Sequence, residues 1–142
     1  MRFATGSLLL SFLAASTASA DFSSRGIPDE ASQEISRADG QRRLTCIAFA
    51  PNGGWSLLSG RNGYINRNIP DEVHRQMERI ANDGHELKCI AFAPNGGWSL
   101  LYGRNGYINR NIPDEAHLAM HHRRELIWIA FGRNNEWSLF YE

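Results

Sequence analysis

The stretch Cys46–Glu72, CIAFAPNGGWSLLSGRNGYINRNIPDE, recurs almost unchanged as Cys89–Glu115. The one difference is Ser59, which becomes Tyr102 in the second copy. Self-similarity at a fixed period, here 43 residues, is typical of proteins built from structural repeats in which each unit packs on its neighbour. The sequence therefore predicts an architecture of repeated units.

Two further segments extend the pattern. Ile127–Glu142 (IWIAFGRNNEWSLFYE) is a diverged third copy of the first half of the unit, and Gly26–Glu30 (GIPDE) is an additional copy of its end. About 120 residues with these repeats suffice for one domain with a real core. We predict that residues 21–142 form a single repeat domain of three units, with approximate boundaries at 26–59, 60–102 and 103–142.

Each unit is predicted to contain a helix followed by two strands. Pro-Asp-Glu begins each helix, because proline fits the first helical turn and acidic side chains complement the positive end of the helix dipole. In the second unit Val73, Met77 and Ile80 then follow at the spacing of an amphipathic helix. The two strands are joined by a four-residue turn, Pro-Asn-Gly-Gly in the first two units, whose residues favour tight turns. The expected first strands are Leu44–Ala50, Leu87–Ala93 and Leu126–Phe131, and the partner strands begin at Trp55, Trp98 and Trp137.

These elements predict an α+β fold of three α-β-β units, with about six mainly antiparallel strands and the helices packed outside. Because the ends of the given sequence divide one unit, we expect closure about a pseudo-threefold axis. The alternative is an open stacked solenoid.

Residues 1–20 are predicted to be a secretory signal peptide. Arg2 supplies the positive start, Leu8–Ala15 is an apolar run too short to span a bilayer, and Ala18-Ser19-Ala20 fits a cleavage site. The mature protein would begin at Asp21 and be secreted, without a membrane span. Removing Arg2 from the fifteen basic residues leaves fourteen against fifteen acidic ones, which argues against bulk capture by nucleic acid or anionic lipid.

The two cysteines, Cys46 and Cys89, hold the same position in successive units, where the third unit has Trp128. For an exported protein with two cysteines a disulfide is the usual outcome. We therefore expect a Cys46–Cys89 bridge if equivalent positions lie close together. The alternative is a pair of buried thiols that pack as small hydrophobic side chains beside Trp128.

The segment Gly60–Asn68 and its copy Gly103–Asn111 are predicted to be ligand-binding loops. They combine Arg, Asn and Tyr, which hydrogen-bond hydroxyls and stack on sugar or other planar faces, and a loop presented twice favours multivalent binding. In the alternative, structural interpretation the tyrosines cap the core and the second arginine of each loop pairs with the following aspartate, as in Arg67 with Asp71. The candidate ligand-binding residues are Arg61, Asn62, Tyr64, Asn66, Arg67, Arg104, Asn105, Tyr107, Asn109 and Arg110.

Two other sets of residues could carry chemistry. Trp55, Trp98 and Trp137 could stack on carbohydrate, but aromatic residues dominate core burial, so we expect them in the core. Asp71 and His74, with their second-unit copies, share a helix face and are compatible with metal or acid–base roles. No HExxH or comparable zinc signature accompanies them. We predict neither a metal site nor a cofactor.

The duplication also bears on function. Catalysis generally needs several different groups in one pocket, whereas a near-exact repeat multiplies one surface. The sequence has no G-x-S-x-G, P-loop or Rossmann pattern. We therefore favour a secreted, non-enzymatic, lectin-like protein that binds an extracellular carbohydrate or another polar ligand, over a hydrolase that uses the Asp-His pairs. The alternative is a secreted effector, toxin or inhibitor that acts on a protein of a host or competing cell.

Overall fold

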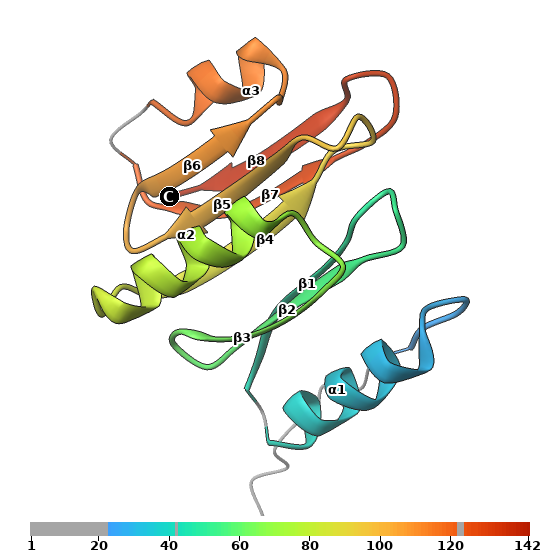
Figure 1. Cartoon of the computed structure of the whole chain (residues 1–142). Helices are drawn as coiled ribbons and strands as arrows, with labels where there is room; N and C mark the ends of the chain where they lie inside the picture. The colour runs from blue at the N-terminus through green and yellow to red at the C-terminus, as the bar shows by residue number, and fades with distance from the viewer. Residues whose placement is uncertain (1–22, 42, 122–123) are drawn as a thin grey trace, which may run out of the picture.

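The computed structural model describes residues 23–41, 43–121 and 124–142, so the predicted signal peptide lies outside it. The fold is α+β and consists of three successive units, as predicted (Figure 1). The first two units have the order helix, strand, strand, strand, and the third has a helix and two strands. The elements are α1 (Asp29–Gly40), β1 (Leu44–Phe49), β2 (Trp55–Ser59), β3 (Gly63–Arg67), α2 (Asp71–Asn82), β4 (Leu87–Phe92), β5 (Trp98–Tyr102), β6 (Gly106–Arg110), α3 (Asp114–Ala119), β7 (Leu126–Phe131) and β8 (Trp137–Tyr141).

The strands form three separate antiparallel sheets, which we call sheet A (β1-β2-β3), sheet B (β4-β5-β6) and sheet C (β7-β8). The described chain therefore has eight strands, and the prediction of about six was too low. The missed strands are β3 and β6, which lie in the segments that we predicted to be loops. Arg-Asn-Gly at residues 61–63 makes a tight turn after Gly60, whose φ is 59°, and the chain then returns along β2. An Asn-Gly pair beside alternating polar and apolar residues is a strong hairpin signal.

Two of the helices are sandwiched between sheets. Val73, Met77 and Ile80 of α2 pack in one cluster with Leu58 of sheet A and Leu100 of sheet B. The third helix is followed by Met120, which packs between sheets B and C in the same way. Of the helices in the described ranges, only α1 covers an outer face, where it packs on Trp55 and Leu57 of sheet A. The prediction that the helices lie outside the strands thus holds for α1 alone.

The three units follow one another in a row, with α1 beyond sheet A at one end (Figure 1). Strand β4 packs against β1 on one side and β7 on the other, and no packing of comparable extent joins β1 to β7 in the described chain. The expected closure about a pseudo-threefold axis is not seen. The row has the character of an open stack, because the extensive packing between units joins each unit to its neighbours.

The middle strand of each three-stranded sheet is buried on both faces. In β2, Trp55 and Leu57 face α1, while Ser56 and Leu58 face α2, and none of the four is more than 2% exposed. Full burial of a leucine contributes about 1.5–3 kcal/mol. Contacts between units therefore supply a large share of the stability of each one.

Candidate functional site

Two of the predicted ligand-binding residues, Arg61 and Arg104, line one surface hollow of about 350 Å³. We call it the turn hollow, because it lies at the β2–β3 and β5–β6 turns. Its lining residues are Arg61, His85, Glu86, Lys88, Gly103, Arg104 and Glu125.

The repeat geometry brings the two arginines together. The carbonyl oxygen of Arg61 accepts a hydrogen bond from the backbone N–H of Leu87 at 2.8 Å, and that of Arg104 accepts one from Leu126 at 2.9 Å. Each turn is thereby tied to the first strand of the next unit. The equivalent turns of the first two units consequently open into the same hollow.

The turn hollow carries a net positive charge. Arg61, Lys88 and Arg104 face two carboxylates, those of Glu86 and Glu125, so the balance is one positive charge with His85 neutral. Lys88 forms an ion pair with Glu125. The hydrogen bond from Lys88, followed by the charges of Lys88 and Arg104, holds the pKa of Glu125 below its usual range. Arg61 and Arg104 are exposed, and Arg61 Nη2 donates to the carbonyl of Gly84 at 3.2 Å.

Asn66 and Asn109 point instead into the protein. Asn66 Oδ1 accepts a hydrogen bond from the buried Ser56 Oγ at 2.7 Å, and its Nδ2 lies 3.2 Å from Nδ1 of His74 and 3.4 Å from Sδ of Met77. These contacts join β2, β3 and α2, so the amide is fully engaged inside the fold. The second unit repeats the arrangement with Ser99, Asn109, His117 and Met120.

Tyr64 and Tyr107 lie beside these networks, between a strand and the following helix. The ring of Tyr64 packs edge-on against His74 with centroids 5.7 Å apart, and the hydroxyl of Tyr107 hydrogen-bonds with Nδ1 of His121. Partial burial raises the pKa of both tyrosines, and the charge of Glu78 adds to the rise for Tyr64. Both rings take part in unit-to-unit packing.

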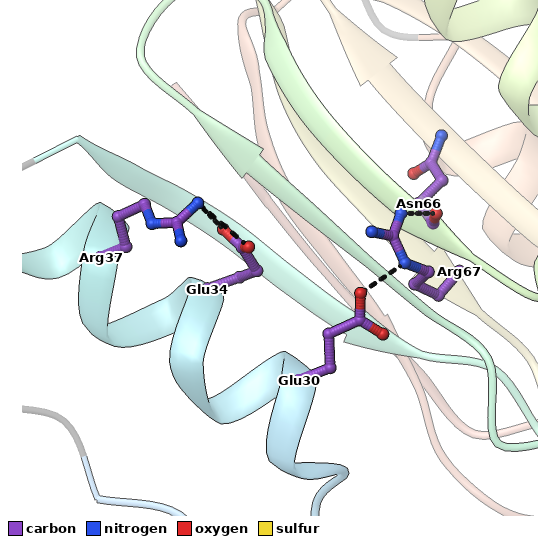
Figure 2. A network of polar contacts seen from close by, with 5 residues as sticks. All are labelled: Glu30, Glu34, Arg37, Asn66 and Arg67. Carbon is purple, nitrogen blue, oxygen red and sulfur yellow. Dashed lines mark hydrogen bonds and ion pairs between the residues drawn. The ribbon is translucent and has the colours of Figure 1, made fainter.

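Arg67 and Arg110 form ion pairs, but with partners other than those we expected. Figure 2 shows Arg67 of β3 reaching Glu30 of α1, with Nε and Oε1 2.7 Å apart, and Arg110 pairs with Glu72 of α2 at 2.7 Å. The expected partner Asp71 is not used. The reason is that the side chains at this position of β3 and β6 face the helix of their own unit, which precedes them in the chain.

The remaining two candidates lie in the turns themselves. Asn62 Nδ2 donates to the carbonyl of Ala81 near the end of α2 at 3.4 Å, and Asn105 is exposed. Of the ten predicted residues, Arg61 and Arg104 are thus the two that share a hollow. The sequence did not point to His85, Glu86, Lys88 or Glu125, since they lie outside the two nearly identical segments. The one available signal was that Lys88 is the only lysine of the chain.

Two tryptophans and two histidines that were considered as site residues have contacts that stabilise the fold: Trp55, Trp98, His74 and His117. Trp55 and Trp98 are 2% and 3% exposed, which confirms the expected core role of these two. His74 and His117 contact the Asn66 and Asn109 amides described above. Within the described ranges, no group of three or more His, Cys, Asp or Glu side chains is arranged to hold a metal ion. No helix of the described part is long and apolar enough to cross a membrane.

The predicted Cys46–Cys89 disulfide is not formed. The two sulfur atoms lie 3.8 Å apart, whereas a disulfide requires about 2.05 Å. Cys46 Sγ also lies 3.6 Å from the carbonyl oxygen of Ile90, and Cys89 Sγ lies 3.6 Å from that of Ile129. The hydrogen bond with Cys46, together with burial, raises the pKa of the Cys89 thiol. The alternative interpretation, two closely packed thiols, describes the site.

A second cavity, of about 300 Å³, lies at the other end of the sheets between the turns of sheets B and C. Its walls include Ala93, Pro94 and Phe131. A smaller cavity of about 150 Å³ occupies the equivalent place between sheets A and B. Both are spaces between adjacent hairpin turns and have mainly apolar walls, whereas the turn hollow gathers charged groups from all three units.

Comparisons with protein-family models, with curated proteins and with solved structures found no match. The functional argument for this chain rests on its own residues. Among the groups described above, the turn hollow is the place where exposed side chains of both repeated segments meet.

Proposed function

We propose that this protein is a non-enzymatic binding protein whose turn hollow recognises a polar ligand with an anionic group, with acidic carbohydrate as the favoured class. The observation that carries this proposal is the meeting of Arg61 and Arg104, from equivalent turns of two units, in one hollow of about 350 Å³. Small-molecule sites commonly occupy about 300–1,000 Å³. The hollow matches a short oligosaccharide segment in size.

The chemistry of the lining favours an anion that also carries hydroxyl groups. Guanidinium groups bind carboxylates and sulfates through paired charge-assisted hydrogen bonds. Glu86 and Glu125 supply acceptors for ligand hydroxyls, and the ring of His85 supplies a face and a donor or acceptor. A small net positive charge selects a ligand with few anionic groups rather than a densely charged polymer such as nucleic acid.

We further propose that the protein acts outside the cell, as the first 20 residues suggest. The secreted protein should then begin at Asp21. N-terminal sequencing of the product from the culture medium tests this. A mature product that retains residues 1–20 would contradict export by signal-peptide cleavage.

The binding test compares polyuronates and sulfated polysaccharides with neutral glucans, with retention and calorimetry as readouts. The Arg61→Ala/Arg104→Ala variant should lose at least about 100-fold in affinity for the acidic ligands, because each charge-assisted hydrogen bond is worth about 1.5–3 kcal/mol. A matched control, Arg75→Ala/Arg133→Ala, removes two exposed arginines that do not line the turn hollow. It should bind as the wild type does.

Equal loss of binding in both double variants would show a nonspecific charge effect and contradict a site in the turn hollow. Absence of binding to every polysaccharide by the folded wild type would refute the carbohydrate proposal. In that case the alternative from the sequence, an effector or inhibitor of a foreign protein, becomes the leading hypothesis. A stoichiometric partner isolated from foreign cell extract, and lost in the Arg61→Ala/Arg104→Ala variant, would support it.

A further inference from the structure

Large hydrophobic side chains are exposed mainly at the two ends of the row of units. Sheet C exposes Trp128 by 42% and Phe140 by 60%, and these two lie directly opposite each other across β7 and β8 with ring centroids 5.6 Å apart. We call this pair the back face of sheet C. In sheets A and B the position of Phe140 is held by Leu58 and Leu101, which are fully buried because the following unit covers them.

The first unit exposes the complementary half of the same kind of interface. Phe49 of sheet A is 40% exposed, whereas its equivalent in sheet B, Phe92, is only 8% exposed. Phe92 belongs to the cluster that contains Ala50 and Leu58 of the preceding unit. We call the side of unit 1 that carries α1 and Phe49 its front. This front lacks the neighbour that buries the equivalent side of unit 2.

The residues at the two ends differ from the inner ones in a complementary way. Trp128 and Phe140 are larger than the cysteine and leucine at the equivalent positions of sheet B. On the outer side of α1, the half-buried Ser32 is smaller than the histidine at the equivalent position of α2. A terminal unit that faces water carries a polar outer face in stable repeat arrays. The back face of sheet C has the opposite character, which indicates that another surface covers it.

The segment before α1 follows the same register as the end of β3. Ile27-Pro28 precedes α1 as Ile69-Pro70 precedes α2, and Gly26 has a positive φ of 71° where Asn68 has one of 51°. In the same alignment, Arg25 is equivalent to Arg67 of β3. Residues 23–25 thus correspond to the end of a third strand, and no strand in the described chain pairs with them. Sheet C, in turn, has two strands, so the outer edge of β8 has no partner in the described chain.

The ion pairs repeat with the same register. Arg67 pairs with Glu30 of α1, as Figure 2 shows, and Arg110 pairs with Glu72 of α2. The next acidic residue in this series is Glu115 of α3, which is exposed and has no ionic partner within the part of the chain that the structure describes. Arg25, which precedes α1, is the first arginine of the series, and Glu115 of α3 is its last acidic residue.

We infer that copies of this chain assemble head to tail, with unit 1 of one copy docked on the back face of sheet C of the next. Residues 23–25 of the docking copy add to the edge of β8, Arg25 pairs with Glu115, and α1 covers Trp128 and Phe140. The interface repeats the packing of unit 2 on unit 1 within one chain. Because its two halves are different surfaces, it is heterologous, and it generates a ring or an open filament rather than a twofold dimer.

The first test is the mass of the purified protein in solution by light scattering and analytical ultracentrifugation. We expect mass to rise past the dimer between about 1 μM and about 300 μM, the range in which a weak specific interface saturates. Phe140→Glu and Phe49→Glu place a charge on one half each and should raise the dissociation constant at least about 30-fold, as loss of a central aromatic contact does. Leu118→Arg is the matched control. Leu118 lies on an exposed surface of α3, and α2 has an arginine, Arg75, at the equivalent position. This variant should assemble as the wild type does.

Mixing the two blocked variants is the decisive experiment. Phe49→Glu retains a free back face and Phe140→Glu retains a free front, so together they should form a one-to-one dimer that grows no further, while each alone stays monomeric. A Phe49→Glu variant that still dimerises alone would reveal a twofold back-to-back interface and overturn the head-to-tail arrangement. A wild type that is monomeric over the whole concentration range would overturn assembly altogether.

Charge reversal tests the register of the interface separately from its apolar contacts. Arg25→Glu and Glu115→Arg should each weaken assembly, and the double variant should recover most of the loss, because the pair is restored with opposite polarity. Both residues are exposed, so circular dichroism and melting temperature should match those of the wild type. Two losses that simply add in the double variant would refute the Arg25–Glu115 contact and the strand register derived from it.

Discussion

Removal of either partner of the hydrogen bond between Ser99 and Asn109 should lower the stability of the protein, by different amounts. Ser99 is fully buried, and its Oγ donates to Asn109 Oδ1 at 2.6 Å. Its other neighbour is the sulfur of Met120 at 3.9 Å, a weak acceptor. Replacing Asn109 with alanine therefore leaves a buried hydroxyl without an oxygen acceptor, which costs about 1–3 kcal/mol.

The reverse deletion should cost less. Ser99→Ala removes the hydroxyl and leaves Asn109, which is only half-buried and whose Nδ2 retains its contacts with His117 and Met120. The expected loss is about 0.5–1.5 kcal/mol, the net value of one hydrogen bond. In the Ser99→Ala/Asn109→Ala variant no buried hydroxyl remains, so its loss should fall short of the sum of the single losses by about 1 kcal/mol.

Urea unfolding of the four proteins at one protein concentration measures these differences directly. The melting temperature should move by roughly 4 °C per kcal/mol. The first unit offers an internal repetition, since Ser56 and Asn66 make the same hydrogen bond at 2.7 Å. Strictly additive losses, or an Asn109→Ala protein within about 0.5 kcal/mol of the wild type, would refute the argument and return Asn109 to the candidate ligand-binding residues.

Three further predictions follow from the contacts. Intact mass after alkylation in denaturant without reductant should show two modified cysteines, since Cys46 and Cys89 are not bridged, and an unmodified protein would show that the bridge forms. Phe92→Ala should lower the free energy of unfolding in urea by about 3–5 kcal/mol, the usual cost of truncating a core phenylalanine. Phe49→Ala should lower it by clearly less, because Phe49 is 40% exposed. Equal losses would contradict the difference in burial. Because the pKa of Glu125 is lowered, its pairing with Lys88 stabilises the fold at pH values above the unfolded-state pKa of about 4.3, and this stabilisation is lost as pH falls through the folded-state pKa. The melting temperatures of Glu125→Gln and the wild type should therefore differ at pH 7 and converge in acid. A difference that stays constant with pH would argue against the pair.

Much of the architecture could be predicted from short-range patterns. Pro-Asp-Glu marked the start of each helix, and Pro-Asn-Gly-Gly marked the turn between the first two strands, because both act through backbone dihedral angles and local charge. The strand Gly63–Arg67 was missed although its Arg-Asn-Gly turn was visible. Its polar residues suggested an exposed loop, but Asn66 is engaged by Ser56 and His74, which come from other elements.

The features that could not be predicted depend on contacts between segments far apart in the sequence. That Arg61 and Arg104 share a hollow, or that Cys46 and Cys89 lie close without bonding, depends on how far apart successive units stack. That spacing is set by the side chains of α2 and α3 that fill the space between the sheets. Periodicity cannot report it, because it follows from packing of residues far apart in the sequence.

The sequence by itself thus determined that this protein is an array of three helix-and-hairpin units, since a repeated local pattern must fold repeatedly in the same local way. Only the tertiary structure decided that the array is a row with two unlike ends, and that Phe49 and Phe140 are left exposed where Phe92 and Leu101 are buried. The physical reason is that burial belongs to a position in the assembled row. Equivalent residues meet water or protein according to whether a neighbouring unit is there to cover them.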